Sequence, residues 1–129
     1  MNIALLVPAT SHKRSYTCFK ETDLYCYLFK SFFTTYSQEH KYTIYLGIDV
    51  DDKLYTDKDI QDNIIKFVGI MNNTDVQLSF FDNKHYKGKP CWIWNELFNR
   101  AYNDDCDYFI LLKYFLLGVQ IIGLVIFMI

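Results

Sequence analysis

Alternation of short apolar runs with amphipathic stretches constrains this chain more than any other feature of its sequence. Apolar runs rich in β-branched and aromatic residues predict strands at residues 2–7, 42–48, 76–81 and 106–112. Between them, apolar side chains recur at helical spacing over residues 23–36, 56–68 and 89–103. Strands that alternate with crossover helices favour a mostly parallel sheet with helices on both faces. The sequence therefore predicts an α/β fold with flanking helices.

Local signals support the expected helices. Leu24 and Leu28 are spaced one helical turn apart, and Thr22 stands where a helix N-cap is expected. In the third helix, Trp92 and Trp94 are two residues apart and cannot share one helix face. We therefore expect one indole ring to pack in the core and the other to lie at a pocket wall or an interface.

Composition excludes some classes of protein. The chain has 129 residues and a formal net charge of -2, with Arg14 and Arg100 as its arginines. We expect no nucleic-acid binding, because phosphate neutralisation needs clustered cations. The four cysteines form no CxxC pair and no zinc-like cluster, so we expect reduced thiols and not a disulfide framework. The N-terminus lacks a signal-peptide pattern, since its basic residues follow its apolar run.

The C-terminal segment, residues 108–129, is almost wholly apolar, and Lys113 is its one charged residue. An apolar run of this length can span a bilayer core, with a lysine near one end reaching the interface. This interpretation predicts a single-pass tail anchor with a cytosolic N-terminal domain. The alternative is a buried strand at residues 108–112, followed by an apolar extension, residues 113–129, that has lost its packing partners. We keep both interpretations open.

The first candidate site follows the first expected strand. Residues 8–14 offer hydroxyl groups and three side chains that can carry positive charge. Since ligands of parallel α/β sheets bind at the carboxyl ends of strands, this loop can approach a nucleotide or its diphosphate. It contains neither GxxxxGK[ST] nor GxGxxG, so no P-loop or dinucleotide fingerprint is present. A solvated surface loop is the alternative.

The second candidate site is the acidic turn after the second expected strand. Asp49, Asp51 and Asp52 lie at the end of a buried run, where carboxylates repel one another unless they are compensated. A divalent cation compensates such a cluster, and so do the N–H groups of a nucleobase and the hydroxyls of a ribose. The spacing is similar to the start of an EF-hand loop, but Leu54 stands where that loop requires glycine. A solvated turn is again the alternative.

In their order and spacing, these segments resemble the GT-A glycosyltransferase superfamily, especially its inverting, family-2-like enzymes. The resemblance covers about residues 1–112. In that family the first strand ends in a V-P-x-[ST] loop, which Val7-Pro8-Ala9-Thr10-Ser11 matches. The second strand ends in an acidic residue that holds the nucleobase and ribose, which Asp49 matches together with Asp51 or Asp52.

A later helix of the family carries the pattern N-x-G-x-x-x-A and precedes a tyrosine-bearing strand. Asn95, Ala101 and Tyr108 match this pattern, although Leu97 replaces the glycine. The resemblance implies a partial GT-A, Rossmann-like fold over residues 1–112 that binds a nucleotide sugar of the UDP-sugar class. The binding residues it implies are Pro8, Ala9, Thr10, Ser11, Asp49, Asp51, Asp52 and Asn95.

The sequence departs from the family after Leu112. There the family carries the Asp-x-Asp that binds Mg²⁺ or Mn²⁺, whereas this chain continues with Lys113-Tyr114-Phe115. The acceptor-binding half and its base are missing too, so we expect a truncation or a frameshift and assign no catalytic residue. Asp49-Val50-Asp51 is itself an Asp-x-Asp. An active minimal transferase that binds metal through Asp49 and Asp51 is a further alternative.

Two hypotheses from different classes follow. The first is a glycosyltransferase-like protein that keeps at most a nucleotide-sugar half-site and does not catalyse transfer. The second is a small tail-anchored membrane protein whose aromatic-rich domain binds a partner, and it predicts detergent-dependent solubility without nucleotide affinity. The first predicts a cytoplasmic protein unless the C-terminal segment anchors it in a membrane.

Overall fold

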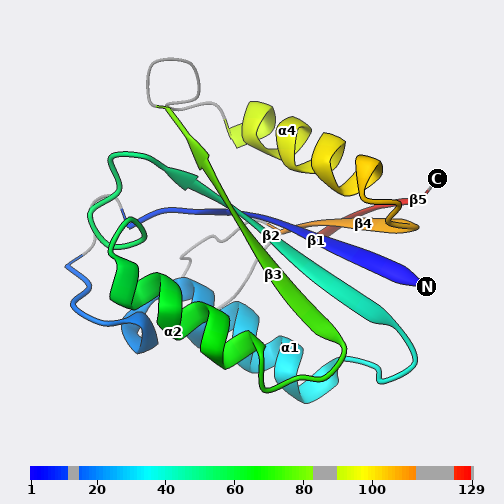
Figure 1. Ribbon diagram of the computed structural model, residues 1–129, viewed down its shortest axis with the longest axis horizontal. Coiled ribbons are helices and arrows are strands. Elements are labelled where there is room, and N and C mark those ends of the chain that lie inside the picture. Colours follow the sequence, from blue (N-terminus) through cyan, green and yellow to red (C-terminus); the bar gives the residue numbers. More distant parts are fainter. Residues whose placement is uncertain (12–14, 83–89, 113–123, 129) are drawn as a thin grey trace.

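A computed structural model describes residues 1–11, 15–82, 90–112 and 124–128 of the chain. Its centre is a five-stranded sheet with the strand order β3-β2-β1-β4-β5 (Figure 1). The strands are β1 (Asn2–Ala9), β2 (Lys41–Asp49), β3 (Thr74–Phe81), β4 (Tyr108–Leu112) and β5 (Leu124–Met128). The first four are parallel to one another, and β5 runs antiparallel to β4. The predicted α/β class and mostly parallel sheet are confirmed.

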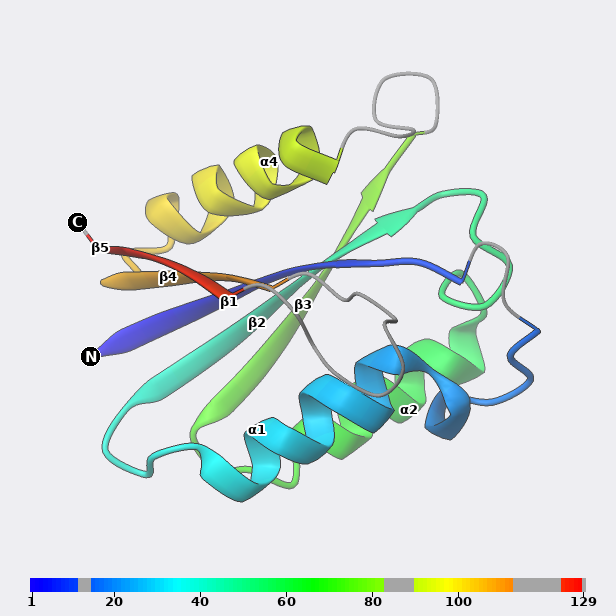
Figure 2. The same ribbon diagram turned by 180° about the vertical axis from the view of Figure 1, so that it is seen from behind.

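Helices cover both faces of this sheet. The described helical elements are η1 (Phe19–Glu21), η2 (Leu24–Phe29), α1 (Lys30–Thr35), α2 (Lys58–Val68) and α4 (Pro90–Asn103). Seen from either side, α1 and α2 lie on one face, while α4 lies alone on the other (Figures 1 and 2). The crossover helices are thus divided between the two faces, as the sequence pattern predicts for a parallel sheet.

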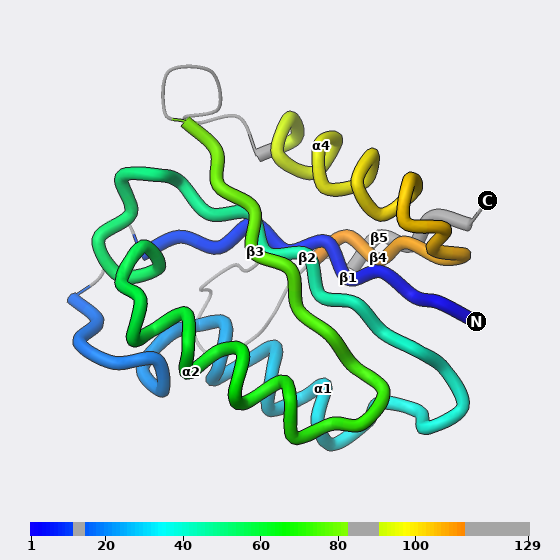
Figure 3. Tube along the Cα trace, viewed as in Figure 1, coloured from blue at the N-terminus to red at the C-terminus, as the bar shows by residue number. Residues whose placement is uncertain are grey.

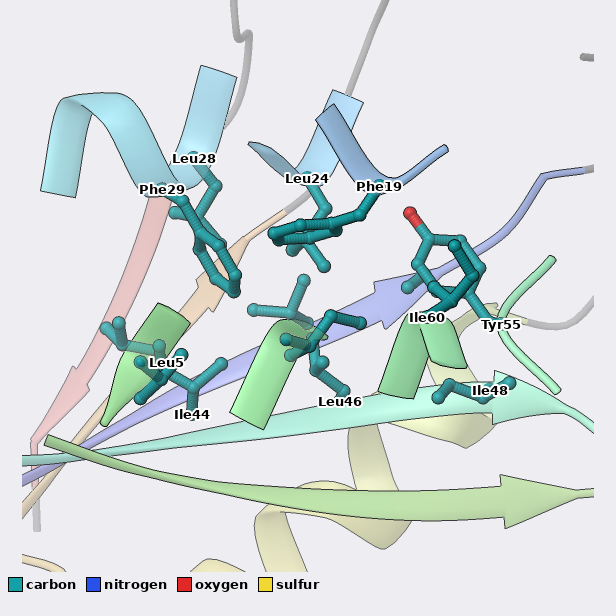
Figure 4. Close-up of a cluster of buried hydrophobic side chains, with 14 of the residues drawn as sticks. Leu5, Phe19, Leu24, Leu28, Phe29, Ile44, Leu46, Ile48, Tyr55 and Ile60 are labelled. Atoms are coloured by element: carbon teal, nitrogen blue, oxygen red, sulfur yellow. The ribbon is translucent and has the colours of Figure 1, made fainter. Parts of the chain in front are cut away.

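Alternation of side chains along the strands divides the core into two clusters. From β2, Ile44, Leu46 and Ile48 pack with helical residues of the α1 and α2 face (Figure 4). Tyr45 belongs instead to the cluster beneath α4, where Leu97 is wholly buried. The first cluster is the larger and contains most of the aromatic rings of the N-terminal helices.

Strand β1 extends further than the sequence predicts. We expected it to end before Pro8, whose ring cannot donate a ladder hydrogen bond, but the strand continues through Ala9. The pairing explains the difference. Strand β4 pairs with β1 only as far as Leu6, whereas β2 pairs with β1 up to Ala9. Because the β1–β4 ladder has ended before Pro8, the missing N–H costs no hydrogen bond in that ladder.

The first predicted helix is present but is not uniform. Its first part, η2, is a π-helix, and only α1 has α-helical hydrogen bonding. Thr22 has extended backbone angles, and its hydroxyl accepts from the backbone N–H of Tyr25 at 3.2 Å. Thr22 therefore provides the predicted cap, although the adjacent Asp23 already has helical angles and makes no side-chain cap bond.

The fourth strand begins later than the sequence predicts. We expected it to include Cys106, but β4 starts at Tyr108. Asp105 has a left-handed φ of 61°, which turns the chain after α4, and the N–H of Cys106 still bonds the carbonyl of Ala101 at 3.1 Å. The first link to β1 comes from the N–H of Asp107, which donates to the carbonyl of Asn2 at 2.7 Å.

The C-terminal segment begins as a strand. Residues 108–112 form β4 beside β1, as one of our two interpretations predicts, and Leu124–Met128 pairs with β4 as β5. No helix within the described ranges is long and apolar enough to cross a membrane. Residues 113–123 and 129, on which the predicted membrane span depends, lie outside the described residues (Figure 1). The tube in Figure 3 shows β4 running beside β1.

Candidate functional site

The two candidate loops begin at neighbouring points of the sheet. Strands β1 and β2 pair in parallel, with Pro8 opposite Gly47 and Ala9 opposite Ile48. One residue beyond these partners stand Thr10 and Asp49. The carboxyl ends of both strands therefore meet at one edge of the sheet, where ligands of parallel α/β sheets bind. The sequence predicted both loops at the carboxyl ends of parallel strands, from the alternation of strands with crossover helices.

A double hydrogen bond joins the two loops. The backbone N–H of Ser11 donates to Oδ2 of Asp52 at 2.7 Å, and the Ser11 hydroxyl donates to Oδ1 at 2.7 Å. Asp52 is 1% exposed and Ser11 is half-buried, so these contacts are partly shielded from solvent. Hydrogen bonds to a carboxylate are stronger than those between neutral groups, which makes this a firm link between the loops after β1 and β2.

Asp52 also organises its own turn. Its Oδ1 accepts from the backbone N–H groups of Leu54 at 3.0 Å and Tyr55 at 2.9 Å. Its carbonyl accepts from the hydroxyl of Thr56, directly before the Asp57 cap of α2. Asp52 therefore holds the chain between β2 and α2, and both of its carboxylate oxygens serve contacts within the protein.

The remaining two carboxylates of the acidic turn have different surroundings. Asp49 is half-buried, and its Oδ1 is inaccessible to solvent, whereas the side chain of Asp51 is exposed. The N–H of Val50 donates to the carbonyl of Phe81 at 2.9 Å, which fixes the start of the turn against the end of β3. Asp49 is the last residue of β2, and the hydrogen bond of Val50 fixes the chain directly after it. Asp49 therefore has a defined position at the edge of the sheet.

Asp49 points toward the face that α4 covers. A Cβ added to Gly47 would lie 2.6 Å from Cγ2 of Ile93 in α4, so the side-chain direction at Gly47 is toward that helix. Since alternate strand residues share a face, Asp49 follows Gly47 on the α4 side. Pro8 lies on the same side, because it follows Leu6, which belongs to the cluster beneath α4. Ala9 is buried on the opposite face.

Asn95 lies on the helix that covers this face. It is exposed on α4 and borders a cleft of about 320 Å³ between α4 and β4. Trp94, Phe98 and Leu111 line the same cleft with apolar surface. Pro8, Asp49 and Asn95 therefore lie on the same side of the sheet, but neither Pro8 nor Asp49 is among the described residues that line the cleft beside Asn95. Trp92 is 52% exposed on the outer side of α4.

The potential metal ligands of the described residues do not gather into a cluster. Across residues 1–11, 15–82, 90–112 and 124–128, no group of three or more His, Cys, Asp or Glu side chains is placed to hold a metal ion. Asp52 cannot supply a free carboxylate, since its oxygens already accept from Ser11, Leu54 and Tyr55. His12, Lys13 and Arg14 lie outside the described residues.

A polar cluster that the sequence did not predict lies beside the start of β4. The hydroxyl of Tyr45 donates to Oδ2 of Asp104 at 2.8 Å and lies 3.6 Å from Sγ of Cys106. Burial raises the pKa of the Tyr45 hydroxyl and of the Cys106 thiol, and the carboxylate of Asp104 adds to both shifts. A thiol with a raised pKa is a poor nucleophile at neutral pH.

The site at the carboxyl ends of β1 and β2 offers hydrogen-bond acceptors and donors to a ligand. The Asp49 carboxylate can accept from N–H or hydroxyl groups of a ligand, and Thr10 and Asn95, both exposed, can donate or accept. No protein-family model, curated protein or solved structure matches this chain.

Proposed function

We propose that this chain binds the nucleotide part of a nucleotide sugar at the carboxyl ends of β1 and β2, as a glycosyltransferase-like half-site that does not catalyse transfer. The proposed donor belongs to the UDP-sugar class. In this role Asp49 accepts hydrogen bonds from the nucleobase or ribose, and Thr10 contacts the same ligand from the neighbouring strand end.

The observation that carries the proposal is the link between Ser11 and Asp52. Ser11 donates twice to the buried carboxylate of Asp52, at 2.7 Å each, and this holds the loops after β1 and β2 together. A site whose parts are already in place before the ligand arrives loses less ordering entropy on binding. Asp49, three residues before Asp52, thereby has a fixed position beside Thr10.

The proposed roles divide the predicted residues into two groups. Ser11 and Asp52 shape the site through contacts with each other, and Ala9 anchors the end of β1 in the core. Thr10, Asp51 and Asn95 are exposed and Asp49 is half-buried, and these four residues are the proposed ligand contacts. Pro8 shapes the strand end beneath them.

A divalent metal is not part of this proposal. Asp49 and Asp51 are the remaining acidic side chains of the turn, and no third His, Cys, Asp or Glu joins them in the described parts of the chain. Mg²⁺ and Mn²⁺ sites use several oxygen ligands, and two carboxylates from one turn form an incomplete set. The proposed activity is therefore binding without metal-assisted transfer.

Calorimetric titration of UDP and a UDP-sugar into the full chain tests the proposal, with and without Mn²⁺. The proposal predicts saturable binding of UDP that does not require Mn²⁺. Binding that appears only with Mn²⁺ would instead assign Asp49 and Asp51 to a metal site. A folded chain that binds neither compound would refute the nucleotide proposal.

A further inference from the structure

A second cleft lies on the α1 and α2 face of the molecule and is lined by none of the residues proposed for the nucleotide site. It has a volume of about 470 Å³, within the range of about 300–1,000 Å³ typical of small-molecule sites. One wall comes from Phe19 and Lys20 of η1 with Tyr25 of η2, and the other from Lys66, Phe67 and Ile70 at the end of α2. We call it the aromatic cleft.

Three aromatic rings form its apolar surface. The ring centroids of Phe19 and Tyr25 are 5.3 Å apart, those of Tyr25 and Phe67 are 5.2 Å apart, and those of Phe19 and Phe67 are 6.0 Å apart. All three pairs pack edge to face, the arrangement that ring quadrupoles favour. Phe67 also stacks on the buried Phe29, so the wall is continuous with the core.

Ile70 extends the apolar surface into solvent at the mouth of the cleft. Its side chain is 71% exposed, the highest value among the exposed large apolar side chains of the described residues. The inward stripe of α2 consists of Ile60, Ile64 and Val68, all buried. Phe67 and Ile70 therefore belong to a second apolar stripe of this segment, which borders the aromatic cleft.

The charge at the mouth is positive. Lys20 and Lys66 both border the cleft with exposed side chains, and the ammonium group of Lys30 lies 5.5 Å from the centroid of the Tyr25 ring. Glu21 is the adjacent acidic residue of η1, and its carboxylate is turned to Thr17, whose hydroxyl and N–H donate to it at 2.9 and 3.3 Å. Glu21 keeps its negative charge, but it does not line the cleft, whereas Lys20 and Lys66 do, so the charged side chains that border the cleft itself are cationic.

The backbone beside this cleft is unusual as well. Tyr25 belongs to η2, a π-helix of six residues. Such segments are rare in proteins and occur frequently at functional sites, because they give up regular hydrogen bonding to place side chains differently. Here the irregular segment contributes a ring to the cleft wall. This observation is independent of the apolar surface and of the charge.

We propose that the aromatic cleft binds a single-chain amphipathic carboxylate, such as a free fatty acid. The hydrocarbon chain packs on the rings of Phe19, Tyr25 and Phe67 and against Ile70, and the carboxylate lies between the ammonium groups of Lys20 and Lys66. An apolar surface with two cations at its mouth complements a ligand that is apolar along its length and anionic at one end. This site is separate from the nucleotide site and does not depend on it.

Calorimetric titration of dodecanoate into the full chain, in detergent-free buffer and below the micelle concentration, tests the inference. We expect saturable one-site binding of dodecanoate. The uncharged dodecanol should bind more weakly, by about fivefold for each lysine that no longer faces a carboxylate. Equal binding of the two compounds would overturn the role of the lysines. Binding to phosphatidylglycerol vesicles without binding of monomeric dodecanoate would overturn the proposal in favour of a membrane-surface contact.

Matched variants in α2 and at Ile70, two residues after its end, locate the site. Lys66→Gln and Ile70→Asn change exposed side chains that border the cleft, so the fold is kept while binding weakens by about fivefold. Lys58→Gln and Ile65→Asn change exposed side chains of the same helix that do not line the cleft, and they leave dodecanoate binding unchanged. The same affinity in all four variants would place the ligand elsewhere and contradict the proposal.

Discussion

The backbone N–H and the hydroxyl of Ser11 both donate to the carboxylate of Asp52, each at 2.7 Å, across 41 positions of sequence. This contact joins the loop after β1 to the loop after β2. Asp52 was predicted as a ligand contact together with Asp49 and Asp51, but its oxygens face the protein. Its carboxylate therefore acts on the site by positioning, and Asp49 is the carboxylate of the turn with a fixed place at the sheet edge.

Replacing Asp52 should destabilise the fold. Asp52→Ala removes four hydrogen-bond acceptor contacts of a buried carboxylate and leaves the N–H groups of Leu54 and Tyr55 without their partner. We expect the free energy of unfolding to fall by about 3 kcal/mol. The measurement is equilibrium unfolding in urea.

Asp51→Ala is the matched control, because Asp51 is one residue away and exposed. A change at such a surface position typically stays within about 0.5 kcal/mol. An equal loss of stability in both variants would show that the negative charge of the turn matters, and not the contacts of Asp52.

Gly47 lies where α4 packs closely on β2. An added Cβ would lie 2.6 Å from Cγ2 of Ile93 and 3.3 Å from Cδ1 of Leu97, so Gly47→Ala must displace the helix or its side chains. We expect a loss of about 1–3 kcal/mol in the free energy of unfolding. Gly69→Ala, at the C-cap of α2 with an ordinary φ of -64°, should cost less. The opposite order in urea unfolding would contradict the described packing of α4.

Tyr45 should make stability depend on alkaline pH. Burial raises the pKa of its hydroxyl above the value of about 10 in the unfolded chain, so the unfolded chain loses this proton first. The free energy of unfolding therefore falls as pH rises above about 10, and the contribution of the hydroxyl is fully present below that pH.

The test compares Tyr45→Phe with the unsubstituted chain in urea. At about pH 8 the variant should be less stable by about 1 kcal/mol, since it lacks the hydrogen bond to Asp104. At about pH 11 the difference should narrow or reverse, because only the unsubstituted chain carries the Tyr45 titration. If the two chains differ by the same free energy of unfolding at both pH values, the assignment of this pH dependence to Tyr45 is refuted.

Much of the fold follows from the pattern of apolar residues. The order of strands and helices was predicted from short apolar runs and helical spacing, and the parallel pairing from the rule that crossover helices join parallel strands. Boundaries were less accurate where a neighbouring strand decides them. Strand β1 continues past Pro8 through its pairing with β2, after its pairing with β4 has ended, and no local signal at Pro8 contains that information.

Less of the site was predictable. Strand order brought residues 8–11 and 49–52 to one edge, but the sequence could not say which carboxylate faces inward. The burial of Asp52 depends on Ser11, which is distant in sequence. The aromatic cleft was also missed, because Phe19 and Phe67 meet only through tertiary packing and the π-helix of η2 has the same apolar spacing as an α-helix.

The most direct test of the nucleotide proposal is calorimetric titration of UDP into the full chain and into two variants. Asp49→Ala removes the proposed acceptor for the base and ribose, while Asp75→Ala removes an exposed carboxylate near the start of β3, away from the site. The account predicts that UDP binds the unsubstituted chain and Asp75→Ala alike, without Mn²⁺, and that Asp49→Ala abolishes binding. UDP binding that survives unchanged in a folded Asp49→Ala variant would contradict it.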